Sequence, residues 1–233
     1  MQAVILAGGL GTRLWPITET VPKPMVPVRG VPYLQHQLDL LVKQDIREIV
    51  LLTGYLGEQV EAYFGNGSAW NCEIRYSREP QPLGTGGALL LAEPMLAPEF
   101  LLIYGDSLLP IDYTDLASKL RAHRAEGVTA LYFDPKRETS VPPNIAVNEE
   151  GMILRYDKNS PGDPGLTHID AGVLAFQRSI LKELPVEKKL ISLEVEAYPK
   201  LIERKAFYGY PTTQRFFDIG TPERLRVLEE YLA

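Results

Sequence analysis

Short apolar segments alternate with amphipathic ones through the first half of the chain. Strands are predicted at 3–7, 46–53, 72–77 and 99–104, and helices at 32–44, 57–64 and 84–92. The segments 46–53 and 99–104 are almost continuously apolar, which is typical of strands covered on both faces of a parallel sheet. This repeated strand–helix order predicts an α/β fold of the Rossmann-like, doubly wound kind, with helices on both faces of the sheet.

The second half of the chain has a more mixed pattern. Helices are predicted at 113–126, 192–203 and 221–231, strands at 128–133 and 169–176, and a hairpin from 144–147 and 152–156. The mixed pattern makes the sheet predominantly, but not entirely, parallel. Gly172 is expected to break the strand at 169–176. Thr221 followed by Pro222 is a strong helix start, with Thr221 as the cap.

Composition and charge exclude several classes of protein. With 233 residues, 45% of them hydrophobic and 23% charged, the chain can bury a full core. A net charge of −6 argues against a general nucleic-acid or membrane surface. Cys72 is the only cysteine, so no intrachain disulfide forms. No apolar run approaches the ~20 residues of a membrane span, and no signal peptide is apparent. We therefore expect a cytoplasmic protein.

The first 25 residues carry the most distinctive chemistry. An apolar strand runs into Gly8-Gly9-Leu10-Gly11-Thr12-Arg13, and Pro22-Lys23-Pro24 follows. Glycines after a buried strand let backbone N–H groups approach an anion closely, and Arg13 and Lys23 add two positive charges. The loop lacks the third glycine of a dinucleotide-binding turn and the Gly-Lys-Ser/Thr of a Walker loop. A purely structural turn would not account for the two charges, so a polyphosphate site is favoured.

This ordered motif resembles the signature of the sugar-1-phosphate nucleotidyltransferases, and the resemblance covers essentially the whole chain. It implies one GT-A-like nucleotidyltransferase domain over 1–233, with a nucleotide-binding half at about 1–106 and a sugar-phosphate-binding half at about 107–233. Because the chain ends soon after its last predicted helix begins, no C-terminal β-helix domain is expected. The implied partners are small-molecule substrates, an NTP and a sugar 1-phosphate, and a homo-oligomer is left open.

The resemblance also implies a catalytic set with Mg²⁺ as its cofactor. Arg13 and Lys23 would hold the phosphates and stabilise the charge on departing pyrophosphate. Asp106, which follows an apolar strand, would bind Mg²⁺ together with Asp218 near the end of the chain. Two carboxylates suit Mg²⁺, which prefers oxygen ligands. Because Thr221 can cap the last helix by itself, Asp218 is expected to be free for this role.

The predicted nucleotide contacts come from the first strand, the glycine loop and the segment 79–87. They are Leu6, Ala7, Gly8, Gly9, Gly11, Thr12, Arg13, Lys23, Glu79, Gly84 and Thr85. Relatives that select uracil or thymine resemble one another in carrying Gln where this chain has Glu79. A carboxylate only accepts hydrogen bonds, so it pairs with the N1–H and N2–H₂ groups of guanine and repels the carbonyls of uracil or thymine. Glu79 thus favours GTP; a Glu79 that simply faces water is an equal alternative.

The sugar side departs further from the family pattern. Asp157 and Lys158 stand where relatives carry Glu-Lys-Pro, with the acid on a sugar hydroxyl and the lysine on the sugar phosphate, but Asn159 replaces the proline. The predicted sugar-phosphate contacts are Asn144, Asp157, Lys158, Asp170 and Gly172. His168 and Glu194 have no assigned role. The segment 191–199, which contains Glu194, resembles one in guanylyltransferases for manno-configured sugars and heptoses, although Ser192 could equally be a plain helix cap.

Together these residues favour nucleotidyl transfer from GTP to a heptose or manno-configured sugar 1-phosphate, for cell-surface glycan synthesis. One alternative is an enzyme that uses UTP or dTTP with glucose 1-phosphate or an N-acetylated sugar 1-phosphate, including N-acetylmuramate. A second alternative is a non-catalytic regulatory subunit that binds a nucleotide sugar. It ranks lower because the chain keeps Arg13, Lys23, Asp106 and Asp218 together.

Overall fold

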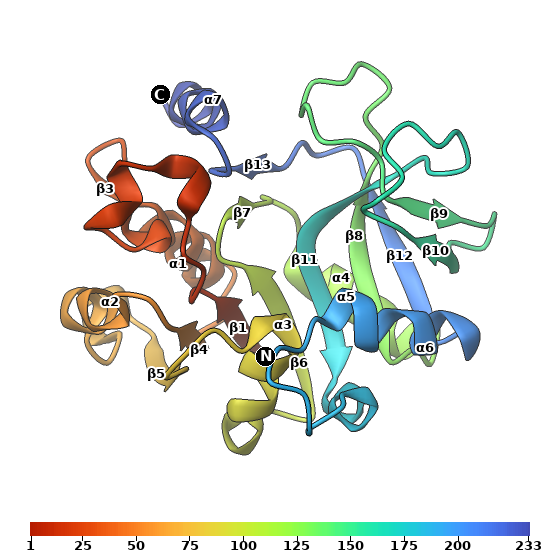
Figure 1. Ribbon diagram of the computed structural model, residues 1–233, viewed down its shortest axis with the longest axis horizontal. Helices are drawn as coiled ribbons and strands as arrows, with labels where there is room; N and C mark the ends of the chain where they lie inside the picture. Colours follow the sequence, from red (N-terminus) through yellow and green to blue (C-terminus); the bar gives the residue numbers. More distant parts are fainter.

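The computed structural model describes all 233 residues and is built around a seven-stranded sheet in the order β12-β8-β11-β6-β1-β4-β5 (Figure 1). Its strands are β1 (Gln2–Leu6), β4 (Glu48–Thr53), β5 (Glu73–Arg78), β6 (Glu99–Tyr104), β8 (Gly127–Tyr132), β11 (Ile169–Gln177) and β12 (Phe207–Thr212). Neighbouring strands are parallel except that β11 is antiparallel to both β6 and β8. The predicted mixed, predominantly parallel sheet is confirmed.

Helices cover both faces of this sheet, as predicted. On one face lie α1 (Tyr33–Lys43), α2 (Gly57–Phe64) and α4 (Tyr113–Ala122); on the other lie α3 (Gly84–Leu91), α5 (Leu193–Glu196) and α6 (Tyr198–Glu203). Successive side chains of a strand point to opposite faces. In β1, accordingly, Ala3 and Ile5 pack on the first layer and Val4 on the second. Two-sided burial explains why β4 and β6 read as continuous apolar runs.

Three two-stranded sheets and a last helix complete the fold. The small strands are β2 (Pro27–Val28), β3 (Val31–Pro32), β7 (Ser107–Leu108), β9 (Ile145–Val147), β10 (Ile153–Tyr156) and β13 (Phe217–Asp218). The last helix, α7 (Pro222–Tyr231), buries Leu228 in a cluster with Leu14 and Val26. The end of the chain therefore packs against the segment that follows the glycine loop.

Two expected elements differ in detail. The helix predicted at 192–203 is divided at Ala197 into α5 and α6, since Pro199 lacks the N–H that a continuous helix would need there. The strand β11 is bulged at Gly172 rather than broken, because its register with β8 shifts between Asp170 and Leu174. Gly172 has φ +76°, and a Cβ there would lie 2.5 Å from the Ser107 hydroxyl. Only glycine fits this turn without strain.

The carboxyl ends of β1, β4, β6 and β8 lie at one edge of the sheet, since β11 is antiparallel to its two neighbours. Ligands of open α/β sheets bind beyond this edge. The glycine loop, Asp106 and the connection from β8 to β9 all leave the sheet here. No helix of the structure is both long and apolar enough to cross a membrane.

Candidate active site

A cleft of about 490 Å³ opens at this edge of the sheet. All eleven residues predicted to contact the nucleotide line this cleft, and so does Asp106. The structure brings them together from the end of β1, the glycine loop, the segment before α3 and the end of β6. That they bind a nucleotide stays a prediction, but they share one cavity.

The cleft also has a wall that the sequence did not indicate. Leu190 lines it although this side chain is 66% exposed. Its neighbour Ile191 is joined to the start of α3, donating from its backbone N–H to Leu83 and accepting at its carbonyl from Gly86, both at 2.8 Å. The partners of Ile191 are more than 100 residues away in the sequence. A contact over that distance leaves no local pattern from which it could have been predicted.

The glycine loop folds back onto the segment that carries Lys23. Gly11 has φ +65°, and a Cβ there would lie 3.1 Å from the Lys23 Cβ. The Thr18 hydroxyl donates to the Gly11 carbonyl at 2.8 Å and fixes the turn. Lys23 Nζ reaches the Asp106 carboxylate at 2.5 Å, with the two side chains 12% and 32% exposed. A short charge-assisted contact of this kind holds both groups at the floor of the cleft.

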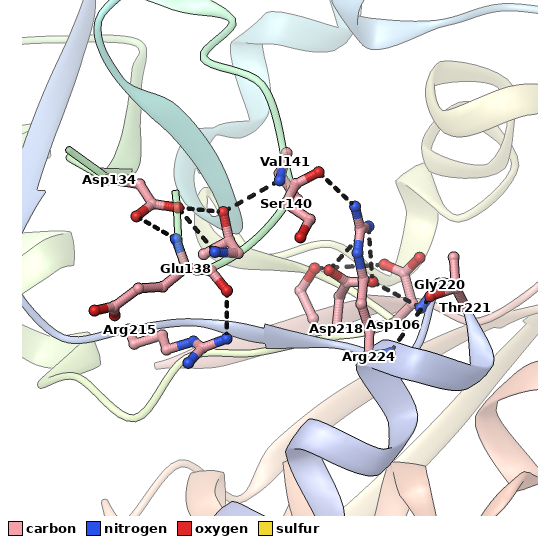
Figure 2. Close-up of polar contacts among 12 residues, drawn as sticks. Asp106, Asp134, Glu138, Ser140, Val141, Arg215, Asp218, Gly220, Thr221 and Arg224 are labelled. Carbon is pink, nitrogen blue, oxygen red and sulfur yellow. Dashed lines mark hydrogen bonds and ion pairs between the residues drawn. The ribbon is translucent and has the colours of Figure 1, made fainter. Parts of the chain in front are cut away.

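Asp106 and Asp218 lie side by side, as predicted for a shared metal site (Figure 2). Asp218 in β13 pairs with Ser107 in β7, and Ile219 donates from its backbone to the Asp106 carbonyl at 3.1 Å. The hydroxyl of Tyr33, buried without a hydrogen-bond partner, is near both carboxylates: burial raises its pKa, and Asp106 and then Asp218 raise it further. The pairing of β13 with β7 therefore brings the two aspartates next to each other.

These two side chains fit a hard divalent cation. Each offers carboxylate oxygens, the ligands that Mg²⁺ prefers, and Mg²⁺ needs only one or two carboxylates alongside water and substrate phosphates. No group of three or more Asp, Glu, His or Cys side chains in the structure is arranged to hold a metal ion. The other ligand positions would thus be filled by water and phosphate oxygens. The metal role of Asp106 and Asp218 stays a prediction.

The expectation that Asp218 is free is wrong. Its carboxylate accepts from the Gly220 backbone at 2.7 Å and from Arg224 Nη1 at 3.2 Å to each oxygen. Thr221 does cap α7, as expected, by accepting from the Arg224 backbone. Capping by Thr221 satisfies the backbone at the start of α7, but it leaves the side chain of Arg224 free to bind Asp218.

Glu79 lies half-buried in the cleft rather than simply in water. Its Oε2 accepts from the Leu83 backbone at 3.0 Å, while Oε1 accepts from no protein donor. A Cβ on Gly8 or Gly54 would lie 2.9 or 2.8 Å from this Oε1, so the two glycines make room for the carboxylate. Burial raises the pKa of Glu79, and the Leu83 N–H only partly offsets it. An acceptor without a donor is therefore held in the cleft beside Gly8 and Gly54.

Glu194, which the sequence left unassigned, joins the start of α3 and the end of β6 to Lys158. It accepts from Thr85 at 3.0 Å, Tyr104 at 2.9 Å and Ser192 at 2.6 Å, and pairs with Lys158 at 3.1 Å. Burial alone would raise its pKa, but the charge of Lys158 and the Ser192 hydroxyl outweigh burial and lower the pKa to about 2. Ser192 thus donates to a side chain and does not cap α5 through its hydroxyl. Only the resemblance of this segment could have drawn attention to Glu194.

The predicted sugar-phosphate residues are brought together only in part. Lys158 Nζ lies 5.8 and 5.5 Å above the ring centroids of Tyr104 and Tyr156, beside the cleft. Asp157 instead pairs with Arg155 at 2.8 Å. Chiefly through this contact with Arg155, the pKa of Asp157 is lowered to about 2. Lys158 and Asp157 therefore have different partners, Glu194 and Arg155.

Asp170 and Asn144 form a buried polar pair behind Lys158. The Asp170 carboxylate accepts from Thr129 and the Gly172 backbone at 3.0 Å and from Tyr156 at 3.2 Å. Its own backbone N–H donates to Asn144 Oδ1 at 2.9 Å. Burial raises the pKa of Asp170. These contacts hold the floor of the sugar side in place, and a direct sugar contact by either residue stays a prediction.

His168 lies at the start of β11, half-buried against Phe133, with the two ring centroids 5.7 Å apart. Its Nδ1 is 2.9 Å from the Thr167 hydroxyl. Burial lowers the pKa of His168. This packing matches a structural role.

Comparisons with known proteins agree with this geometry. The sequence matches the family model described as Nucleotidyl transferase over residues 2–232. It is 34% identical over 228 residues to mannose-1-phosphate guanylyltransferase of Mycobacterium tuberculosis, covering 96% of this chain and 62% of that protein. It is 32% identical over 233 residues to D-glycero-alpha-D-manno-heptose 1-phosphate guanylyltransferase of Aneurinibacillus thermoaerophilus, covering 100% and 98%. The chain thus spans about three-fifths of the mycobacterial relative and nearly all of the other.

The fold is shared as well. The crystal structure of HddC from Yersinia pseudotuberculosis complexed with GMP-PN superposes with a TM-score of 0.82 at 25% identity, covering 100% of this chain and 99% of that one. The predicted nucleotidyltransferase fold is confirmed. On the match over residues 2–232, supported by the cleft and its glycine loop, the chain belongs to the nucleotidyl transferase family.

Proposed function

We propose that this chain transfers a nucleotidyl group from GTP to a heptose or manno-configured sugar 1-phosphate, giving a GDP-sugar and pyrophosphate. The arrangement of the cleft carries the proposal: Arg13 and Lys23 line it at the glycine loop, and the Glu79 carboxylate lines it beside Gly8, where that loop begins. A cleft that offers two cationic side chains and a carboxylate oxygen without a donor is complementary to a nucleoside triphosphate whose base offers donors. Relatives named for such sugars support the choice of acceptor.

The choice of base rests on the unpaired Oε1 of Glu79. Guanine presents two adjacent donors, N1–H and N2–H₂, whereas uracil and thymine present carbonyl oxygens on both sides of one N–H. Because a half-buried carboxylate oxygen without a donor is costly, a ligand that supplies donors to Oε1 is favoured. Burial that raises the pKa of Glu79 reports this same cost.

The reaction is a single in-line displacement. A phosphate oxygen of the sugar 1-phosphate attacks the α-phosphorus of GTP, the bond to the bridging oxygen breaks, and pyrophosphate leaves with its electron pair. The attacking oxygen is already ionised at neutral pH, so no general base is required. The chain's part is to position two polyanions and neutralise their charge. Lys158 serves the incoming phosphate, and Arg13 and Lys23 serve the departing pyrophosphate.

Asp106 and Asp218 would hold the divalent cation. When bound, such a cation neutralises charge on the phosphates and helps to stabilise the leaving group. Lys23, which contacts Asp106 at 2.5 Å, keeps that carboxylate oriented at the floor of the cleft.

The test is release of pyrophosphate by the purified chain with Mg²⁺. GTP, UTP, dTTP, CTP and ATP are crossed with the 1-phosphates of mannose, D-glycero-α-D-manno-heptose, glucose and N-acetylated hexoses, including N-acetylmuramate. Turnover with GTP and a manno-configured or heptose 1-phosphate supports the proposal. Turnover with UTP or dTTP alone refutes the argument from Glu79. Silence across the panel, with tight nucleotide-sugar binding in calorimetry, identifies a regulatory subunit.

A further inference from the structure

Arg224, in the first turn of α7, joins two segments that lie far apart in the sequence (Figure 2). Its Nη1 donates to both oxygens of Asp218 at 3.2 Å, and its Nη2 donates to the Ser140 carbonyl at 3.1 Å. The two paired side chains are 26% and 12% exposed. A guanidinium carries five donors in a planar fork, so it can hold a carboxylate and a carbonyl at the same time.

Ser140 belongs to loop 134–143, which connects β8 to β9 at the carboxyl edge of the sheet. The loop is fixed from within by Asp134, which accepts from the Glu138 backbone at 2.8 Å and from the Thr139 backbone at 2.9 Å. Ser140 has φ +54°, a conformation that side-chain-bearing residues adopt only with support. Arg224 supplies that support at the Ser140 carbonyl.

A second arginine holds the same loop without touching the metal side chains. Arg215 Nη2 donates to the Glu138 carbonyl at 2.7 Å (Figure 2). The loop then leads into Asn144, which holds Asp170 behind the sugar side. Arg215 and Arg224 are therefore two anchors of one loop, and of the two only Arg224 also binds Asp218.

The charges around the two aspartates are balanced by the protein itself. Asp106 pairs with Lys23 and Asp218 with Arg224. A divalent cation that approaches Asp218 therefore meets a guanidinium on the same carboxylate. Like charges within a few ångströms repel strongly at a partly buried site. Cation and Arg224 must compete, and a change in the hold on Arg224 reaches loop 134–143 through Ser140.

We propose that Arg224 is a positioning residue that competes with a divalent cation for Asp218 and links the occupancy of that carboxylate to loop 134–143. Its consequence for turnover rests on the proposed function, but the link itself belongs to the free protein. Linkage is reciprocal: if the cation weakens the hold on Arg224, then Arg224 weakens the binding of the cation by the same factor.

The first test measures Mn²⁺ binding to the purified protein without substrates. The concentration of free Mn²⁺ is read from its electron paramagnetic resonance signal. The neutral variant Arg224→Gln is expected to bind Mn²⁺ roughly tenfold more tightly than the wild type, because a competing charge is removed. Arg224→Lys, which keeps the charge, and Arg215→Gln, which keeps Arg224, are expected to bind it like the wild type. Arg224→Met is a second neutral variant should Arg224→Gln not fold. Loss of a purely structural residue would weaken binding instead.

The second test is trypsin cleavage after the exposed Lys136 and Arg137 in loop 134–143. Mn²⁺ is expected to speed this cleavage in the wild type and in Arg215→Gln, and to leave the rate unchanged in Arg224→Gln, which lacks the link between Asp218 and Ser140. Unchanged or weaker Mn²⁺ binding in a folded neutral variant overturns the proposal, as does an equal gain in Arg215→Gln. Neither test requires turnover, so failure of the proposed function would leave both results interpretable.

Discussion

At the scale of single residues, each lysine predicted to hold a phosphate has a carboxylate partner on the protein. Lys23 contacts Asp106 at 2.5 Å, and Lys158 contacts Glu194 at 3.1 Å. These partners keep long, flexible side chains in place at the cleft, so little ordering is left for the moment of reaction. We therefore expect Lys23 to contribute to catalysis rather than to the stability of the fold.

Replacement of Lys23 by alanine is expected to lower kcat/KM by roughly 10²–10³-fold, the usual loss when one preorganised charge on a transition state is removed. The melting curve by circular dichroism should change little, because the ammonium faces the cleft. Lys119→Ala, which removes an exposed ion pair on α4, is the matched control and should leave the rate unchanged. A wild-type rate in Lys23→Ala would remove this residue from the mechanism.

Replacement of Glu79 by glutamine is expected to move the base preference from GTP toward UTP by roughly 10- to 100-fold, since one mismatched buried polar contact costs about 1–3 kcal/mol. The measurement is the ratio of kcat/KM for the two nucleotides with one sugar 1-phosphate. Glu58→Gln, on the exposed surface of α2, should leave the ratio as it is. An unchanged ratio in Glu79→Gln would mean that the backbone alone reads the base.

At the scale of elements, α5 is a helix of four residues whose position depends on the carboxylate of Glu194. That carboxylate binds α3 through Thr85, the end of β6 through Tyr104 and the segment after β10 through Lys158. Together with the Ser192 hydroxyl, these partners give the buried carboxylate four polar contacts. Those contacts take the place of the apolar area that so short a helix cannot supply. The stability of this corner should therefore follow the protonation of Glu194.

The pH dependence has a definite sign. Glu194 has a pKa of about 2 in the folded protein against an ordinary value of 4.5. Its stabilisation is thus complete above about pH 4.5 and is lost as the pH falls toward 2. Glu194→Gln should lower the free energy of unfolding by on the order of 3 kcal/mol at neutral pH, because a pKa lowered by one unit corresponds to ~1.4 kcal/mol.

Urea unfolding of both proteins at several pH values checks this expectation. The gap between wild type and Glu194→Gln should narrow as the pH falls from 4.5 toward 2. Glu203→Gln, an exposed position at the end of α6, should show no gap at any pH. A gap that stays constant across this range would show that Glu194 is not the titrating group.

Local pattern predicts an element well where burial is uniform and poorly where distant contacts decide. Apolar runs placed β4 and β6 correctly, because strands covered on both faces cannot read otherwise. The split between α5 and α6 was missed, although Pro199 stood in the predicted helix as a signal for it. The two-residue strand β13 is too short for any pattern and exists through pairing with β7.

At the scale of the whole molecule, residues from the start, middle and end of the chain meet at one edge of the sheet. Motif and edge rules together could predict that Arg13, Asp106 and Asp218 would meet there. They could not predict that Arg224 would pair with Asp218, or that Glu194 would reach Lys158. Such side-chain partners depend on how α5 and α7 dock, which no local signal encodes.

The packing of α7 shows how the chain closes this arrangement. Leu228 joins Leu14 and Val26 in one buried cluster, so the last helix braces the segment after the glycine loop. The sheet itself runs without interruption from β12 to β5. A division into nucleotide and sugar halves at about residue 106 stays a prediction, and both halves share the one cleft edge.

The most direct test of the central claim is ³¹P nuclear magnetic resonance of the purified chain with Mg²⁺, GTP and D-glycero-α-D-manno-heptose 1-phosphate or mannose 1-phosphate. The account predicts a GDP-sugar and pyrophosphate in equal amounts, and none of either when the sugar phosphate is left out. Consumption of GTP without a GDP-sugar, or product only with UTP or dTTP, would contradict it.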